Sequence, residues 1–334
     1  MRKVAVVTLV FMALALYFGS TWAAEKVIFS LNWAWYGPHV AFFPGVELKY
    51  YEQEGLDVEI VRGYGSGDVV KRVDTGTVTF GLADLATVVL GRAGGAKVKA
   101  VGGFYAIAPH AIFSLEKKGI KKPKDLEGKT LAFGGPGDAN WIFLPAFAAL
   151  TGLDVNKVKV VQLDPTAEAP MLLAGKTDAD GEFIEILPRY VFAAAKQGDK
   201  MSVMRYYDYG FKVYGLAFIA QDKTVAEKPE LVRKFLRAVY KSTKWAIENP
   251  EKAAKMLIKH RPELDEKEML EGWKIAMELI LAPEVYEKGL GYLLEDKVQF
   301  TIDTVGKYQG LKAPVTTKEL YTNEFLTKEI PKRR

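Results

Sequence analysis

The 334 residues contain no cysteine, which excludes disulfide bonds, thiolate catalysis, iron–sulfur clusters and a lipid-modified amino-terminal cysteine. Histidine is nearly absent too, and His39, His110 and His260 are too scattered to indicate a zinc site. The net charge of +5 is mild, and no stripe of Lys and Arg alternates with aromatic residues. We therefore expect no nucleic acid, no metal and no cofactor.

The amino terminus has the features of an export signal. Arg2 and Lys3 precede the apolar run Val4–Phe18, which is too short for a comfortable membrane span, and small residues follow at Thr21 and Ala23. We expect a signal peptide over residues 1–24 that is cleaved, which places the mature chain in the periplasm. An uncleaved anchor is the alternative.

About 310 residues then remain, which exceeds one typical core and favours two lobes. Strand-like and helix-like segments alternate from Val27 to Ala220, a pattern typical of mostly parallel sheets covered by helices. From Pro229 onward the apolar spacing is helical. These helices need a partner, and the simplest arrangement returns the chain to the first lobe, so that two crossings form a hinge.

The loop after the first strand is rich in aromatic residues. Trp33, Trp35 and Tyr36 would either fill a core or cover a flat ligand, whereas Phe42, Phe43 and Tyr51 are expected to belong to the core. Loops at the carboxyl ends of strands are where two-lobed sheet proteins bind ligands.

Two glycine-rich turns, Gly63–Asp68 and Gly134–Asn140, each follow a strand and open a helix. Glycine lets the backbone approach a ligand, and a helix amino terminus presents free N–H groups. Neither turn matches a nucleotide-binding fingerprint. The alternative is that Asp68 and Asp138 are simply helix caps.

Other polar candidates end strands. Asp84, Glu182 and Glu185 are consistent with acid–base work or with accepting hydrogen bonds from a ligand's amino groups. Nothing else in the sequence completes an active site. His39 follows a Gly-Pro turn and is either catalytic or structural.

The run Leu31-Asn32-Trp33, the following His39 and the segment Tyr50–Val58 resemble the solute-binding proteins of ABC importers for thiamine pyrimidine precursors, alkanesulfonates, taurine and nitrate. The resemblance covers nearly the whole mature chain and continues in Asp74–Asp84, Lys122–Lys129, Ala174–Ala179, Lys228–Leu236 and Tyr321–Leu326. It is specific for the family and not for the ligand.

The resemblance implies a two-lobed periplasmic binding protein of type II, with a mostly parallel sheet in each lobe and the carboxyl-terminal helices packed on lobe 1. The expected lobe boundaries are residues 25–110 plus 217–334 for lobe 1 and 111–216 for lobe 2, with a hinge near 108–113 and 213–218. The implied partners are a small-molecule ligand and an ABC transporter permease in the inner membrane, and the chain is expected to be a monomer.

The fungal thiamine pyrimidine synthase of the same superfamily makes an enzyme the alternative. Its pyridoxal-phosphate lysine follows a Met-Gly-Leu segment that matches Phe80-Gly81-Leu82, and Ala83 stands in the lysine's place. Thr87 replaces its next histidine, and its cysteine cluster cannot exist here. Without the amine there is no Schiff base, so the resemblance implies a binding protein.

The ligand expected from the aromatic loop and the carboxylates is a heteroaromatic ring such as a formylaminopyrimidine thiamine precursor, with a small organic anion such as a sulfonate as the alternative. By resemblance, the expected ligand contacts are Trp33, Trp35, Tyr36, His39, Ser66, Gly67, Asp84, Gly137, Asn140 and Glu185.

Overall fold

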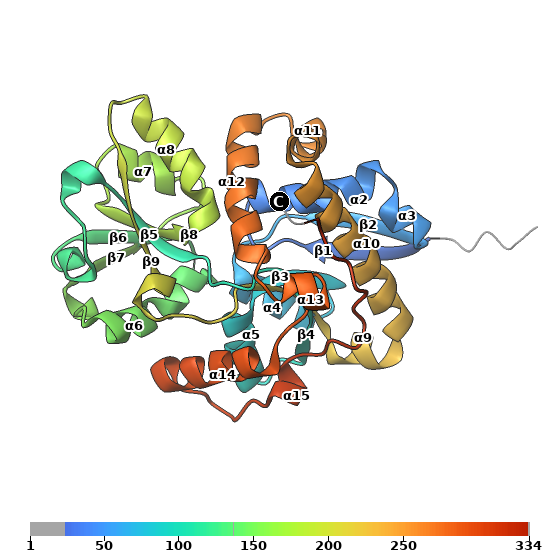
Figure 1. Cartoon of the computed structure of the whole chain (residues 1–334). Helices are drawn as coiled ribbons and strands as arrows, with labels where there is room; N and C mark the ends of the chain where they lie inside the picture. The colour runs from blue at the N-terminus through green and yellow to red at the C-terminus, as the bar shows by residue number, and fades with distance from the viewer. Residues whose placement is uncertain (1–23, 136, 333–334) are drawn as a thin grey trace, which may run out of the picture.

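The computed structural model describes residues 24–135 and 137–332, in two lobes that each contain a five-stranded sheet (Figure 1). The expected signal peptide lies, apart from Ala24, outside the described residues. No helix within the described ranges is long and apolar enough to cross a membrane.

Lobe 1 is built on a sheet in the order β2-β1-β3-β10-β4. Its strands are β1 Glu25–Ser30, β2 Leu56–Val61, β3 Phe80–Asp84, β4 Val98–Gly103 and β10 Leu216–Gln221. The helices that flank it are η1 Gly37–Phe42, α2 Phe43–Glu47, α3 Tyr50–Gln53, α4 Ser66–Asp74, α5 Leu85–Ala93 and α9 Asp222–Glu227. Phe42, Phe43 and Tyr51 are buried, which confirms their place in the core.

Lobe 2 is built on a sheet in the order β7-β6-β8-β5-β9. Its strands are β5 His110–Leu115, β6 Thr130–Phe133, β7 Lys159–Gln162, β8 Ala179–Phe183 and β9 Met201–Arg205. Its helices are η2 Glu116–Lys118, η3 Pro123–Leu126, α6 Ala139–Thr151, η4 Val155–Lys157, α7 Glu168–Leu173, η5 Ile184–Ile186, α8 Leu187–Ala195 and η6 Tyr206–Tyr209.

Each sheet has one reversed strand, and in both lobes it is the strand by which the chain enters that lobe from the other one. β10 pairs antiparallel with β3 and β4, and β5 pairs antiparallel with β8 and β9, while the remaining strands share one direction. The sheets are therefore mixed, with parallel strands in the majority as expected.

The chain passes between the sheets twice, through residues 104–109 and 210–215. The two passages pack together at Gly215, where a Cβ atom would lie 2.7 Å from the Ile107 carbonyl oxygen. His110 already belongs to the second sheet and Leu216 to the first. Hinge motion at these passages stays a prediction.

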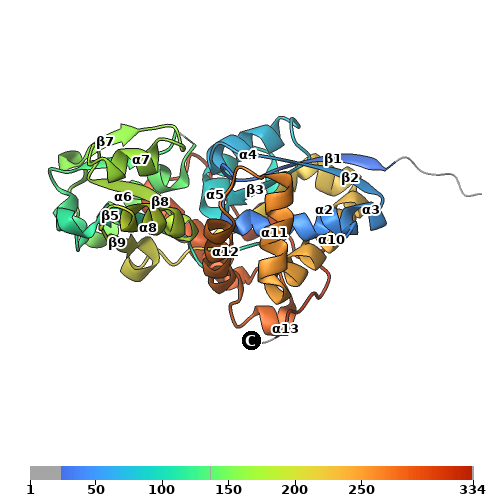
Figure 2. The same ribbon diagram turned by 90° about the horizontal axis from the view of Figure 1, so that it is seen from above.

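The carboxyl-terminal helices are α10 Pro229–Glu248, α11 Pro250–His260, α12 Glu266–Ile280, α13 Val285–Lys288, α14 Glu295–Gln309 and α15 Thr317–Leu320. Their return to lobe 1 is confirmed: Ser242 of α10 donates to the Ala41 carbonyl and accepts from the Gly45 N–H, each at 2.7 Å. Helix α12 stands at the border of the lobes and packs on η1 and on η5 (Figures 1 and 2).

Candidate functional site

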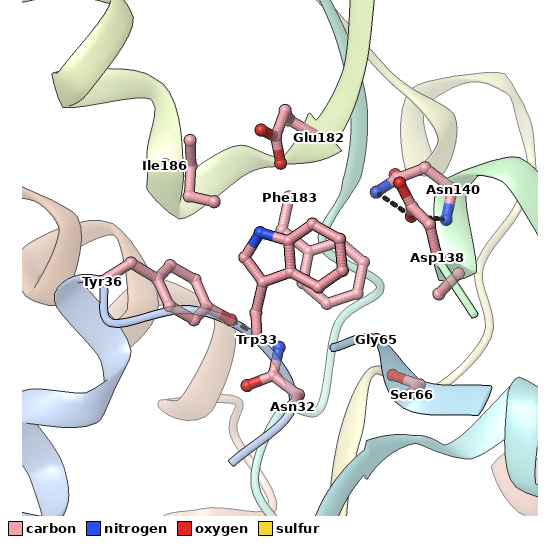
Figure 3. Close-up of a pocket in the computed structure, with 11 residues that line it drawn as sticks. Asn32, Trp33, Tyr36, Gly65, Ser66, Asp138, Asn140, Glu182, Phe183 and Ile186 are labelled. Atoms are coloured by element: carbon pink, nitrogen blue, oxygen red, sulfur yellow. Dashed lines mark hydrogen bonds between the residues drawn. The ribbon is translucent and has the colours of Figure 1, made fainter. Parts of the chain in front are cut away.

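A small cavity lies between the lobes, where the loops after β1 and β2 meet the ends of β6 and β8 (Figure 3). Its interior leaves only about 20 Å³ for the centre of a water-sized sphere, which is room for about one water molecule, so a ring-sized ligand fits once the lobes part or Trp33 turns. The residues that line it are Asn32, Trp33, Tyr36, Gly65 and Ser66 from lobe 1, and Asp138, Ala139, Asn140, Glu182, Phe183 and Ile186 from lobe 2.

Trp33 crosses the boundary between the lobes. Its indole lies at the centre of the lining residues in Figure 3, and the residue is 8% exposed because lobe 2 covers it. Gly134 is the neighbour that allows this approach: a Cβ atom there would lie 2.8 Å from Trp33 Cζ2, closer than side chains tolerate. Trp33 is thus buried and also lines the cavity, and its contact with a flat ligand stays a prediction.

A buried hydrogen-bond network holds the same loop from behind. The His39 Nδ1 atom accepts from the Tyr36 N–H at 3.4 Å, so Nε2 is left to donate to Asn32 Oδ1 at 3.1 Å. Asn32 Nδ2 in turn donates to the Tyr36 hydroxyl at 2.8 Å. Burial lowers the pKa of His39 to about 3, which keeps the imidazole neutral. His39 therefore orients the cavity wall without reaching the cavity.

The Tyr36 hydroxyl also links the lobes. It donates to Glu185 Oε1 in η5 at 3.3 Å, and both residues are buried. Burial raises the pKa of Glu185 to about 7. Glu185 lies behind the wall, next to Gly272 of α12, whose added Cβ would lie 2.7 Å from the Glu185 carbonyl oxygen.

The two glycine turns meet each other across the boundary. The Gly67 N–H in the first turn of α4 donates to the Gly137 carbonyl at 3.1 Å. Gly65, with φ of +110°, is the residue that caps α4 and also approaches Gly137. Contact between backbones at this distance requires glycine on both sides, so the turns serve lobe closure as well as the cavity wall.

Asp138 and Asn140 form part of the lobe 2 wall. Asp138 caps α6: its carboxylate accepts from the Asn140 N–H at 2.7 Å and from the Gly134 N–H at 2.8 Å. Asp68, the other expected cap, is not one, because Gly65 occupies the cap position of α4. The Oδ1 atom of Asn140 is buried and has no hydrogen-bond partner among the described residues.

Glu182 completes that wall at the end of β8. Its Oε1 atom lies 3.2 Å from the Tyr190 hydroxyl, behind the cavity. Burial raises the pKa of Glu182 to about 8 and that of Asp138 to about 6. Apart from the Asn140 amide nitrogen, which donates to Asp138 at 3.3 Å, the polar side-chain groups of this wall are carbonyl and carboxyl oxygens, and neither Lys nor Arg stands among the described lining residues.

Four of the ten expected contact residues line the cavity: Trp33, Tyr36, Ser66 and Asn140. Six do not, although they lie near it: Trp35, His39, Gly67, Asp84, Gly137 and Glu185. Asp84 caps α5 and lies beneath Ser66, whose Oγ accepts from the Asp84 N–H at 3.0 Å. Trp35 turns outward, with the Arg261 guanidinium 4.3 Å from its ring centre.

The expected contact set lacked seven residues that line the cavity: Asn32, Gly65, Asp138, Ala139, Glu182, Phe183 and Ile186. The alternation of side chains along a strand was the usable signal for Glu182, because it shares a face of β8 with Asp180, a second buried acid. In the part of the chain that the structure describes, no group of three or more His, Asp or Glu residues is placed to hold a metal ion.

Two mixed sheets joined by two crossings, with a cavity between them, define the periplasmic binding protein fold. The alkanesulfonate-binding protein SsuA of Xanthomonas axonopodis pv. citri has this fold, with a TM-score of 0.68 at 16% identity over 90% of this chain and 99% of that one. Residues 37–253 match the family described as NMT1/THI5 like, and the chain belongs to that family.

Relatives in the family include both binding proteins and enzymes. The chain is 26% identical to a formylaminopyrimidine-binding protein of Halalkalibacterium halodurans, over 82% of this chain and 78% of the relative. It is also 26% identical to a 4-amino-5-hydroxymethyl-2-methylpyrimidine phosphate synthase of Saccharomyces cerevisiae, over 73% of each chain.

Proposed function

We propose that this protein is the periplasmic solute-binding component of an ABC importer and closes around a single heteroaromatic ring that bears amino groups. A pyrimidine precursor of thiamine is the first candidate. The observation that carries the proposal is the acceptor-rich wall of lobe 2, where Asp138, Asn140 and Glu182 face a cavity beside Trp33.

An acceptor that is buried on closure without a donor costs about 1–3 kcal/mol. A ligand that fills this cavity must therefore bring hydrogen-bond donors, and an amino-substituted ring presents them along one edge. The indole of Trp33 offers a flat apolar surface for the face of the same ring. The relative from Halalkalibacterium halodurans, named for a formylaminopyrimidine, supports this choice.

A sulfonate or nitrate fits the same wall poorly. An anion would lie beside the carboxylates of Asp138 and Glu182, without a Lys or Arg side chain among the described lining residues. An anion is repelled strongly by the Asp138 carboxylate in a dry site, and the Gly67 N–H of the first glycine turn already donates to the Gly137 carbonyl of the second. The structural likeness to SsuA concerns the fold.

A synthase reaction has no support in the residues present. Ala83, at the place of the family's pyridoxal-phosphate lysine, is a buried methyl group on β3 that pairs with Ala217 of β10. No lysine stands among the described residues of the cavity wall. These residues do not fit a Schiff-base cofactor, so the amine that such chemistry needs is missing.

Calorimetric titration of the mature protein tests the proposal with three ligands: 4-amino-5-hydroxymethyl-2-methylpyrimidine, its formylaminopyrimidine relative and an alkanesulfonate. We expect micromolar or tighter binding of at least one pyrimidine and none of the sulfonate. Trp33→Ala should abolish binding, whereas Trp245→Ala, on α10 away from the cavity, should preserve it. Binding of the sulfonate without either pyrimidine would overturn the proposal.

A further inference from the structure

The carboxyl groups in the cavity wall and behind it differ in how many hydrogen-bond donors they receive. Asp138 accepts two backbone N–H groups and the Asn140 side chain. Asp180, one layer deeper, accepts from the Thr177 hydroxyl at 3.1 Å and from the Tyr190 hydroxyl at 3.0 Å. Both groups therefore have partners that stabilise a negative charge.

Glu182 and Glu168 lack such partners. The Tyr190 hydroxyl lies near Glu182 as well as Asp180, but it has one hydrogen and can donate to only one of them. Glu168 is fully buried, and its carboxyl oxygens accept from no N–H or hydroxyl group of the described residues; its partner is the Glu182 carboxyl, with which it can share a proton. The two glutamates thus receive fewer hydrogen-bond donors than Asp138 and Asp180 do.

The charged groups around Glu182 do not compensate for the missing donors. Besides burial, the charges of Asp138 and Asp180 raise the pKa of Glu182, whereas a hydrogen bond with Glu168 and the charge of Arg189 lower it. The Arg189 guanidinium is already engaged, because its Nε donates to Glu268 at 2.8 Å and its terminal nitrogen donates to the Trp35 carbonyl at 3.4 Å. Little positive charge is left for the cavity.

We propose that the site binds its ring in the protonated, cationic form, with Glu182 as the carboxylate that faces the ring nitrogen and Glu168 as a neutral positioning residue behind it. This inference rests on the proposed function and adds the charge of the ligand. Two adjacent carboxylates in a dry site cannot both stay ionised, so one proton stays on Glu168.

The proton balance is simple. One proton, taken from Glu182 where that group is protonated and from solvent where it is not, moves to a ring nitrogen, and no other bond forms or breaks. Burial, followed by the charge of Glu182, raises the pKa of Glu168 far above its usual range, in keeping with its neutral role. The cation then gives Glu182 a charged donor in addition to the proton that Glu168 shares with it.

The test is the ring-nitrogen chemical shift of ¹⁵N-labelled 4-amino-5-hydroxymethyl-2-methylpyrimidine bound to the mature protein at pH 8. We expect one ring nitrogen to show the shift that the free compound shows in acid. A shift equal to that of the free compound at pH 8 would overturn the inference. Binding of the compound in that experiment would still support the proposed function. If neither this compound nor its formylaminopyrimidine relative binds, the proposed function fails first.

Two matched variants assign the roles. Glu182→Gln should weaken binding on the order of a hundredfold and return the nitrogen to its neutral shift. Glu168→Gln should leave affinity within about threefold and keep the cationic shift, because glutamine replaces a neutral acid. Glu263→Gln, at an exposed turn, is the control. A loss of the cationic shift in Glu168→Gln would contradict the assignment, and so would its retention in Glu182→Gln. If a variant fails to fold, the ring-nitrogen shift measured with the unmodified protein still tests the inference.

Discussion

Gly134→Ala should weaken ligand binding, because the added methyl group meets Trp33 only when the lobes are closed. The new Cβ would lie 2.8 Å from Trp33 Cζ2 and closer still to Cη2. Either the indole must shift or the lobes must stay apart. Overpacking of this kind costs about 1–3 kcal/mol, which corresponds to roughly 5- to 150-fold in the dissociation constant.

Gly135→Ala is the matched control, because a Cβ at the next residue meets nothing within 4 Å. Both variants would be compared by calorimetry for affinity and by thermal unfolding without ligand. We expect weaker binding in Gly134→Ala alone, with little change in its ligand-free unfolding temperature. Equal affinities for the two variants would refute the contact between Trp33 and lobe 2 in the bound state. If Gly134→Ala also unfolds at a clearly lower temperature without ligand, the clash is present in the ligand-free protein as well.

Three other outcomes follow from the site. His39→Ala should weaken binding about tenfold, because the buried loop loses a hydrogen-bond partner, whereas His260→Ala should bind normally in the same titration. Ligand-free stability should fall as pH rises from about 4.5 to 8, because burial raises the pKa of Glu182 to about 8 and the folded state keeps a proton that the unfolded state has already released. Glu182→Gln should make the denaturation profile less steep, while Asp84, Asp180 and Glu185, whose pKa values are also raised by burial, keep part of the slope. Arg189→Ala removes the ion pair with Glu268 of α12 and should weaken binding two- to fivefold, an effect that shrinks in high salt; a salt-independent change would mean that charge is not the cause.

The fold was largely predictable, because its strands and helices have strong local patterns. Pro229 and Pro250 stand at the first helical position, where proline's missing N–H costs nothing, and helices α10 and α11 begin there. The apolar spacing alone predicts a helix over 190–197, whereas helix α8 spans 187–195, because Pro188 opens the helix earlier than that spacing indicates. The reversed strands β5 and β10 could not be read from local pattern, since direction depends on the crossings.

The site was predictable to the level of its loops and not of its side chains. The first loop and both glycine turns border the cavity, as strand ends should. Which side chain of a loop faces inward depends on how the lobes meet: Glu182 lines the cavity while Glu185, three residues on, accepts from Tyr36 behind it. The turn that carries Ser66 separates Asp84 from the cavity, and this contact joins segments that are distant in the sequence.

The direct test of the central claim is a crystal structure of the mature protein with 4-amino-5-hydroxymethyl-2-methylpyrimidine. We predict one ring between the lobes, with its face on Trp33 and its amino edge within hydrogen-bond distance of Glu182 and Asp138 or Asn140. A ring bound outside this cavity, or inside it with its donors turned away from the lobe 2 wall, would contradict the account.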